Sequence, residues 1–399
     1  MKILLIVDDY LPYSIKVAAK MMHELACEFV NRGYNVSVVT PDYKIDNTFK
    51  TEVIDGVGVY YFKSGRIKNV HLLIRAINEF LLPFRALLNL RKILNKQPHD
   101  LVIYYSPSIF WGPYVYLLKK RWGVPSFLVL RDIFPQWVID NGTLSSWSPV
   151  TVFFKLFERI NYRSADCIAL QSPKNQDWFK ARHKYKYNTT ILYNWSKNSK
   201  TSSDGSFRKS YEIQGKTLFF YGGNVGRAQD MGNILRLAER MLPEKNAYFV
   251  ILGDGDEVEL VKEIIESKKL VNTLYLPPVD QVEFRLILSE IDIGLFSLNR
   301  EHTTQNFPGK LLGYMAQGIP ILGSINPGND LKDVIEKHNA GLISVNGDDE
   351  LFYTNAHKFL KDKKIRKTIG ENANRLLSEL FSVESAADEI INFYQNRKK

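Results

Sequence analysis

Residues 218–227 read LFFYGGNVGR, an apolar run that leads directly into a glycine-rich turn. A buried parallel strand has this continuous apolar character, and paired glycines let the chain turn sharply toward a following helix. The same order recurs at 248–256, where YFVIL is followed by GDGD and then by a helical pattern. Strand, turn and helix in alternation predict a parallel sheet with crossover helices, and therefore an α/β fold.

This alternation fills both halves of the chain, which are separated by a segment, Lys197–Lys216, rich in Ser, Lys, Asn and Gly. We therefore predict two doubly wound, Rossmann-like domains, 1–196 and 197–382, that hold ligands in a cleft at the carboxyl ends of both sheets. A C-terminal helix, 383–399, follows, and its packing across onto the first domain is left open. The predicted strands are Ile3–Val7, Val36–Thr40, Leu101–Tyr104, Ser126–Leu130, Cys167–Leu170, Thr190–Leu192, Leu218–Tyr221, Tyr248–Leu252, Leu274–Leu276, Ile293–Phe296 and Ile319–Leu322.

Composition excludes several classes of protein. With 45% hydrophobic residues among 399, the chain is too apolar to be disordered, and two cysteines are too few for a disulfide scaffold. Cys27 and Cys167 lie in a predicted helix and a predicted strand, so we expect core residues in a reducing compartment. No window offers the roughly 20 uncharged apolar residues of a membrane-spanning helix. These features predict a cytoplasmic protein.

The net charge of +10 lies in the first half, where residues 1–195 carry 26 Lys and Arg against 15 Asp and Glu. It is densest at 63–96, where eight basic residues and one acid alternate with Leu, Ile and Phe. Basic amphipathic helices of this kind bind the headgroup plane of anionic membranes, which is the interpretation that we favour. The alternative is a core-packing helix with a solvated basic face and a bend at Pro83. Nucleic acid ranks low as a partner, because no nucleic-acid motif or zinc-ligand spacing is present.

Three turns in the second half have the composition of a phosphate-binding site. In the third, residues 307–310 read FPGK, and a lysine in the first turn of a helix is unfavourable unless an anion offsets its charge. Glycines in the other two turns let backbone N–H groups approach a diphosphate. The candidate anion contacts in these turns are Gly222, Gly223, Gly253, Gly255, Pro308, Gly309 and Lys310.

These motifs, taken in order, resemble the retaining glycosyltransferases of family 4, which have the GT-B fold, over nearly the whole chain. The resemblance includes RGYNVSVVT at 32–40, RDIFPQ at 131–136, INYRSADCIALQS at 160–172 and FPGKLLGYMAQGIPIL at 307–322. It is greatest for bacterial O-antigen and capsule enzymes that transfer N-acetyl-L-fucosamine. The resemblance implies a UDP-sugar donor, a polyprenyl-diphosphate-linked GlcNAc-type acceptor, retention of anomeric configuration, and a place on the inner face of the cytoplasmic membrane.

The sequence departs from the family pattern at the donor diphosphate. The family has an Arg and a Lys after the first strand of the second domain, where this chain has Asn224 and Gln229. Two family glutamates correspond to Gln305 and Gly313, and Glu301 lies four residues before the first of them.

The glycine pair that the family has after its first strand is also replaced, here by Ser14-Ile15-Lys16. We infer that Lys310, with Arg227 and Lys16, supplies the positive charge that the missing clamp would give. Glu301 remains a candidate contact to a donor hydroxyl.

Asp132 and Arg131 are the catalytic candidates, because they follow a predicted strand at the carboxyl edge of its sheet. Asp132 is expected to contact the acceptor hydroxyl as base or orienter, and Arg131 stands where the family often has a histidine. No Asp-x-Asp run of the metal-binding kind lies in these loops, since Asp254 and Asp256 are expected to cap the next helix. We therefore expect neither metal nor other cofactor.

Other functions fit the same fold. A sugar-nucleotide 2-epimerase would need more acid-base groups than these loops offer. A catalytically silent sugar-nucleotide binding subunit is compatible with the missing glutamates. A transferase that acts on a soluble acceptor would not associate with liposomes.

Overall fold

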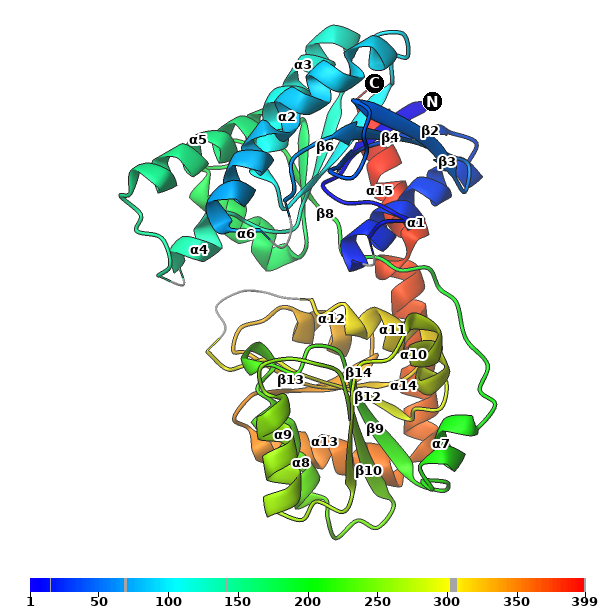
Figure 1. Ribbon diagram of the computed structural model, residues 1–399. Coiled ribbons are helices and arrows are strands. Elements are labelled where there is room, and N and C mark those ends of the chain that lie inside the picture. The colour runs from blue at the N-terminus through cyan, green and yellow to red at the C-terminus, as the bar shows by residue number, and fades with distance from the viewer. Residues whose placement is uncertain (15, 68–69, 141, 302–306, 398–399) are drawn as a thin grey trace. The chain divides into compact units, whose positions relative to one another are not determined.

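The computed structural model describes residues 1–399 except 15, 68–69, 141, 302–306 and 398–399 (Figure 1). The chain divides into two compact units: Met1–Tyr193 with Val383–Lys399, and Asn194–Ser382. These divisions lie within a few residues of 196 and 382, and they assign the last helix to the first unit. The α/β class and the two Rossmann-like sheets are confirmed.

The first unit has an eight-stranded sheet in the order β3-β4-β2-β1-β5-β6-β7-β8, parallel except for the β3–β4 hairpin. Its strands are β1 (Lys2–Ile6), β2 (Asn35–Asp42), β3 (Phe49–Ile54), β4 (Val57–Lys63), β5 (Leu101–Ser106), β6 (Ser126–Leu130), β7 (Cys167–Leu170) and β8 (Thr189–Ile191). Its helices are α1 (Val17–Asn31), α2 (Leu72–Leu94), η1 (Ile109–Trp111), α3 (Gly112–Trp122), α4 (Gln136–Asp140), α5 (Pro149–Ser164), α6 (Pro173–Arg182) and α15 (Val383–Asn396).

Helix α2 contains four of the eight basic residues of the 63–96 segment and continues through Pro83, while Lys68 lies outside the described residues. Leu82, Ala86 and Leu90 are buried in a core that also contains Trp111 and Tyr114. One face of the helix therefore packs as the core-packing interpretation expects. Within the part of the chain that the structure describes, no helix has both the length and the apolar character of a membrane span.

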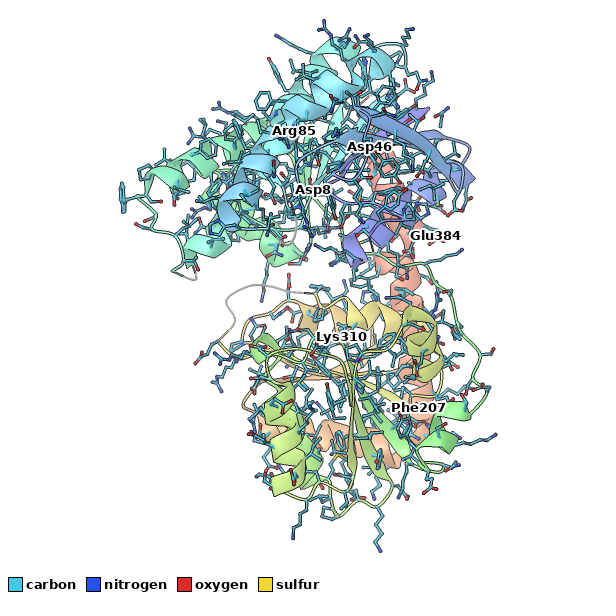
Figure 2. The ribbon with its side chains drawn as sticks, viewed as in Figure 1. Asp8, Asp46, Arg85, Phe207, Lys310 and Glu384 are labelled. Carbon is cyan, nitrogen blue, oxygen red and sulfur yellow. The ribbon has the colours of Figure 1, made fainter. Side chains whose placement is uncertain are left out.

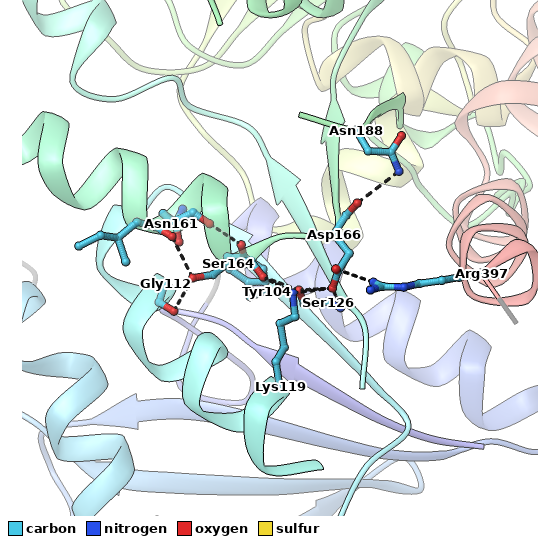
Figure 3. A network of polar contacts seen from close by, with 10 residues as sticks. Tyr104, Gly112, Lys119, Ser126, Asn161, Ser164, Asp166, Asn188 and Arg397 are labelled. Carbon is cyan, nitrogen blue, oxygen red and sulfur yellow. Dashed lines mark hydrogen bonds and ion pairs between the residues drawn. The ribbon is translucent and has the colours of Figure 1, made fainter. Parts of the chain in front are cut away.

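Helix α15 packs against α1 in the first unit, where Arg32 binds Asp388 (Nη1–Oδ1, 2.5 Å) and the carbonyl of Glu384. A second connection, made of ion pairs and a hydrogen bond, is centred on Asp166, between α5 and β7 (Figure 3). Its carboxylate binds Lys119 and Arg397, each with an N–O distance of 2.6 Å, and accepts a hydrogen bond from the amide of Ser126. This carboxylate thus joins α3, β6 and the chain end.

The second unit has a six-stranded parallel sheet in the order β11-β10-β9-β12-β13-β14. Its strands are β9 (Thr217–Gly222), β10 (Ala247–Leu252), β11 (Thr273–Leu276), β12 (Ile293–Ser297), β13 (Ile321–Ile325) and β14 (Gly341–Val345). Its helices are α7 (Ser206–Ser210), η2 (Arg227–Gln229), α8 (Met231–Arg240), α9 (Val258–Ser267), α10 (Gln281–Leu288), α11 (Lys310–Gln317), α12 (Leu331–Lys337), α13 (Asp349–Lys361), α14 (Lys363–Leu376) and η3 (Leu377–Phe381).

The sequence prediction located eleven of the fourteen described strands and omitted three. Two of them, β3 and β4, form a hairpin whose turn, Asp55-Gly56, has positive φ at both residues. Asp-Gly is a strong hairpin signal that the strand-and-helix pattern obscured. The third, β14, ends the second sheet, and α7 lies within the predicted linker.

Asp166 supplies a test of what holds the first unit together. Burial alone would raise its pKa, but hydrogen bonds from Lys119, Ser126 and Arg397 outweigh burial and leave the pKa lowered. We expect Asp166→Asn to cost about 2 kcal/mol or more of unfolding free energy at neutral pH. The cost should shrink as pH falls below about 4, because the wild-type carboxylate then takes up a proton and loses the same contacts.

The measurement is thermal unfolding followed by circular dichroism at several pH values. Asp388→Asn is the matched control, since this carboxylate is largely exposed and its pair with Arg32 is worth less than about 1 kcal/mol. Equal effects of the two variants would contradict the assignment of Asp166 as the central tie.

Candidate functional site

The second unit changes its winding direction between β9 and β12. From β9 the chain proceeds outward to β10 and β11, and it then returns to the other side to form β12, β13 and β14. Ligands of doubly wound sheets bind beyond the carboxyl ends of the strands at such a point. Strand β9 ends here at Gly222, so the first glycine turn lies at this position.

The two glycine turns that follow β9 and β10 pack directly against each other. The amide of Val225 donates to the carbonyl of Asp254 (2.8 Å), and the amide of Glu257 donates to the carbonyl of Val225 (3.0 Å). A Cβ at Gly253 would lie 1.8 Å from the carbonyl oxygen of Gly223, and one at Gly255 would lie 2.1 Å from that of Val225. The packing of one turn on the other therefore explains why both positions are occupied by glycine.

The expected cradle of glycine amides needs correction. The amide of Gly222 donates to the Tyr314 hydroxyl (3.3 Å), and the amide of Gly223 donates to the carbonyl of Leu252 (2.9 Å). Both N–H groups thus have acceptors inside the protein. The first amides of a helix lack intrahelical acceptors, so Gly309 and Lys310 at the start of α11 are the better donors to an anion.

Lys310 is the first residue of α11 (Figure 2), and its side chain lies against Tyr221 near the end of β9. Its Nζ lies 3.3 Å from the centroid of the Tyr221 ring, and a Cβ built on Gly223 would lie 3.4 Å from its Cε. The ammonium nitrogen is buried and has no hydrogen-bond partner among the residues that the structure describes. Burial holds the pKa of Lys310 well below its usual value.

Tyr314 fixes the helix that carries this lysine. It lies one turn after Lys310 and is fully buried, and its hydroxyl is 3.1 Å from the carbonyl oxygens of both Phe220 and Leu295. Helix α11 is therefore attached to β9 and β12 at the point where the sheet changes direction. An isolated buried cation is costly, and an anion bound beside it would remove that cost.

The other predicted donor contacts lie around the first turn. Asn224 donates to Gln229 (Nδ2–Oε1, 2.6 Å), so the residues that replace the family clamp bind each other. The side chain of Arg227 is 85% exposed and lies 3.7 Å from Asp256. Glu301 is exposed and Pro308 is half-buried, while Gln305 lies outside the described residues.

The expectation that Asp254 and Asp256 cap the next helix is wrong. The N-cap of α9 is Glu257, whose side chain makes no capping bond. Asp254 accepts from the amide of Gly255, and Asp256 accepts from the amide of Arg227. Glu257 instead accepts from the amide of Met231 (3.0 Å), at the first residue of α8.

In the first unit, Arg131 and Asp132 follow β6, as predicted from the sequence. The guanidinium of Arg131 donates to the carbonyl of Tyr193 (3.1 Å), and burial lowers its pKa to about 10. Asp132 is exposed at the strand end, and partial desolvation raises its pKa against the opposing charge of Arg131. Asp132 is thus suited to take up a proton.

Lys16 lines a cavity of about 290 Å³ at the carboxyl ends of β1 and β5, where the first sheet changes direction. Asp8 lies in the same cavity and accepts a hydrogen bond from the Trp111 indole (2.5 Å). Burial, followed by the charge of Glu79, raises the pKa of Asp8 to about 7. The lining residues are Val7, Asp8, Asp9, Lys16, Ala18, Met22, Ile67, Val70, Arg75, Glu79, Tyr105, Pro107 and Ser108.

Sequence analysis missed three of these residues as parts of a site. Asp8 directly follows a predicted strand, the same signal that identified Asp132. The four-residue spacing of Lys310 and Tyr314 places both on one face of a helix, which identifies Tyr314 as the anchor. Tyr221 had no such signal, because it reads as an ordinary strand residue.

Comparison with known proteins agrees with this geometry. The family profile described as "Glycosyl transferase 4-like domain" matches residues 18–195, and that described as "Glycosyl transferases group 1" matches residues 203–376. The probable glycosyltransferase WbjE of Pseudomonas aeruginosa is 26% identical over 232 residues, which are 56% of this chain and 57% of that protein. The chain spans about half the length of the curated relatives it matches.

Two solved structures share the fold at 14% sequence identity. Sucrose-phosphate synthase from Thermosynechococcus elongatus has a TM-score of 0.74, over 99% of this chain and 98% of that one. HepE from Anabaena, solved in complex with UDP, has a TM-score of 0.69 over 99% and 100%. The two family profiles, one on each sheet, and the two Rossmann-like units show that the chain belongs to the family 4 glycosyltransferases of the GT-B fold.

Proposed function

We propose that this protein is a retaining glycosyltransferase that moves a sugar from a nucleotide donor to a lipid-linked acceptor. N-acetyl-L-fucosamine from its UDP donor is the preferred sugar, and a polyprenyl-diphosphate-linked GlcNAc-type acceptor is the preferred substrate, as in O-antigen or capsule synthesis. The observation that carries the proposal is the buried ammonium of Lys310 at the direction change of the second sheet. HepE, a relative in fold, was solved with UDP bound, which supports a UDP-linked donor.

Lys310 acts on the leaving group. Negative charge develops on the diphosphate as the bond to the sugar breaks, and a cation held in a dry site stabilises that charge strongly. The amides of Gly309 and Lys310 add the positive end of α11 beside it. These protein groups supply the charge that a metal gives in other transferases, so turnover requires no divalent ion.

Asp132 acts on the acceptor. Its raised pKa favours uptake of the proton that the acceptor hydroxyl releases, and the adjacent Arg131 keeps part of its carboxylate charge. In this proposal the sugar is attacked on the face from which the diphosphate departs, and no enzyme nucleophile takes part.

We place the enzyme on the cytoplasmic face of the inner membrane, bound through the basic helix α2. Beside its core-packing face, α2 exposes Leu73, Ile74, Ile77 and Leu88, the last to 75%. Phe80 of α2 contacts Phe153 and Phe157 of α5, which extends the surface. Val152, Phe153 and Leu156 are exposed on α5, and Trp147 before it is 90% exposed. A large exposed apolar surface of this kind indicates a binding partner.

A groove between α2 and α3 supports the membrane as that partner. It has a volume of about 410 Å³, and five of its ten lining residues are leucines of the two helices. Arg91, Lys120 and Arg121 line it as well, and none of its described lining residues is a carboxylate. Apolar lining beside three cations matches the interface of an anionic bilayer, where acyl chains meet phosphate headgroups.

Binding of UDP tests the role of Lys310. The pKa of Lys310 is lowered in the free enzyme and should rise when the diphosphate binds. Binding should therefore take up a proton at pH values between the lowered pKa and about 10.5. Calorimetry of UDP binding in buffers of different ionisation enthalpy measures this uptake. Lys310→Met should abolish the uptake and the stabilisation by UDP, yet raise the melting temperature of the free protein by a few degrees, because a desolvated amine is removed.

The direction in which stability changes with pH follows from proton linkage. A lysine whose pKa is lower in the folded protein makes the unfolded chain bind more protons, so the free wild type should gain stability as pH rises toward about 10.5. Lys310→Met should lose this gain. UDP binding that involves no proton exchange and is equally strong in the variant would refute the assignment.

Turnover tests the activity itself. With a panel of UDP-sugars and a lipid-diphosphate GlcNAc acceptor, Lys310→Ala should lower kcat about 100-fold or more, the scale for loss of one charged transition-state donor. Lys364→Ala, an exposed lysine of α14, is the matched control and should leave turnover unchanged.

Two further arms of this assay separate the alternatives. Turnover should persist in EDTA, and complete loss restored by magnesium or manganese would overturn the metal-independent mechanism. If the wild type neither transfers nor hydrolyses any donor in the presence of the acceptor, the protein is a binding subunit instead of a transferase.

Liposome sedimentation tests the membrane surface. Replacing Arg91, Lys92 and Lys96 by Gln should weaken binding to anionic vesicles about 100-fold, because each basic residue contributes about 1 kcal/mol. The control replaces three exposed lysines of α14, Lys363, Lys364 and Lys367, by Gln and removes the same charge. Arg85 is left unchanged, since it binds Asn78. Equal binding of both triple variants to the vesicles would contradict a membrane-binding role for α2 and favour the core-packing interpretation.

A further inference from the structure

Three potential metal ligands meet on the α1 side of the first unit, outside the site described above. His23 and Cys27 are four residues apart on α1, and Asp55 lies in the turn between β3 and β4. Nε2 of His23 is 3.0 Å from Oδ2 of Asp55 and 3.4 Å from Sγ of Cys27. One ligand atom from each residue lies within 4.8 Å of the other two.

These separations suit a tetrahedral zinc ion. Zinc binds nitrogen and carboxylate oxygen at about 2.0–2.2 Å and sulfur at about 2.3 Å, so the ligand atoms around it are roughly 3.3–3.8 Å apart. The His–Asp and His–Cys distances are already close to this range. Residues at i and i+4 share one face of a helix, which is how helical ligand pairs present two donors to one metal.

The third ligand is held in place by the hairpin. Asp55 and Gly56 both have positive φ, 48° and 79°, as a tight two-residue turn requires. A Cβ on Gly56 would lie 3.1 Å from Cγ1 of Val30, so the turn packs closely on α1. The carboxylate of Asp55 is thereby kept beside His23 while remaining 73% exposed, which leaves the position open to an entering ion.

Tyr10 orients the histidine ring. Its hydroxyl lies 2.8 Å from Nδ1 of His23, and the two rings meet edge to face. When the hydroxyl accepts a hydrogen bond from Nδ1–H, the lone pair of Nε2 faces Cys27 and Asp55. Metal-binding histidines characteristically have such a partner on the other ring nitrogen, and loss of that partner typically weakens metal binding 10–100-fold.

We propose that His23, Cys27 and Asp55 form a zinc-binding site with an open fourth position. One nitrogen, one sulfur and one oxygen donor favour zinc over magnesium or calcium, which prefer oxygen ligands alone. The ion fastens the β3–β4 turn to α1 and stabilises the first unit. It takes no part in sugar transfer, and the proposal is independent of the function proposed above.

The experiment uses the full chain stripped of metal by a chelator that is then removed. Zinc titrated in competition with a chromophoric chelator should bind one equivalent and raise the melting temperature of the protein. Magnesium should do neither. Cobalt should bind at the same stoichiometry and give the absorption of a thiolate-bound ion, which Cys27→Ser should abolish.

The variants separate ligation from folding. Cys27→Ser and Asp55→Asn should lose tight zinc binding while the metal-free proteins melt near the wild type, because serine is nearly isosteric and asparagine tolerates positive φ. Tyr10→Phe should weaken zinc binding 10–100-fold. Cys167→Ser, which alters a buried cysteine of β7, is the control and should bind zinc as the wild type does.

Zinc affinity in the wild type that is no greater than in Cys27→Ser would overturn the proposal. So would tight binding that is lost in Cys167→Ser but retained in Cys27→Ser. Because turnover is assigned to Lys310, loss of zinc should lower the melting temperature without abolishing transfer, so failure of this proposal leaves the transferase proposal standing.

Discussion

The geometry of the candidate site in the second unit depends on the buried Nζ of Lys310, which lies over the ring of Tyr221. Tyr314 holds the lysine in this position, because it attaches the same helix to the ends of β9 and β12. Desolvation lowers the pKa of this lysine, because burial disfavours its charged form. A diphosphate bound beside it would favour the charged form. In the function proposed above, this lysine is therefore the group that meets the anionic part of the donor.

The glycine turns shape the site through their packing on each other and not through amides directed at a ligand. Gly253 and Gly255 let the second turn pack on the first, and the amides of Gly222 and Gly223 are used inside the protein. The donors left for a ligand come from the start of α11 and not from the glycines after β9. Asn224 and Gln229 bind each other and carry no charge, so positive charge near the turn is concentrated in Lys310 and the exposed Arg227. In the function proposed above, Lys310 takes the place of the two-cation clamp of the family pattern.

Prediction from the sequence succeeded where one local pattern determines one local structure. Buried parallel strands are continuous apolar runs, so β9 and β10 were found almost to the residue, and Lys310 was found as a cation that begins a helix. The failures involve partners distant in sequence. Glu257 caps α8 and not its own helix, and nothing near Gly222 in the sequence reveals that Tyr314 accepts from its amide. The hairpin at Asp55-Gly56 was different, because its signal was present but masked by the prevailing strand-and-helix rhythm.

The cavity around Asp8 connects the features of the first unit. It is lined by Lys16 and Met22 at the start of α1 and by Arg75 and Glu79 on α2, so a shift of either helix alters the surroundings of one carboxylate. That carboxylate has a pKa of about 7, raised by burial and then by Glu79. A small change in the distance to Glu79 therefore changes its charge near neutral pH. Any contact that moves α1 or α2 would therefore act on this carboxylate.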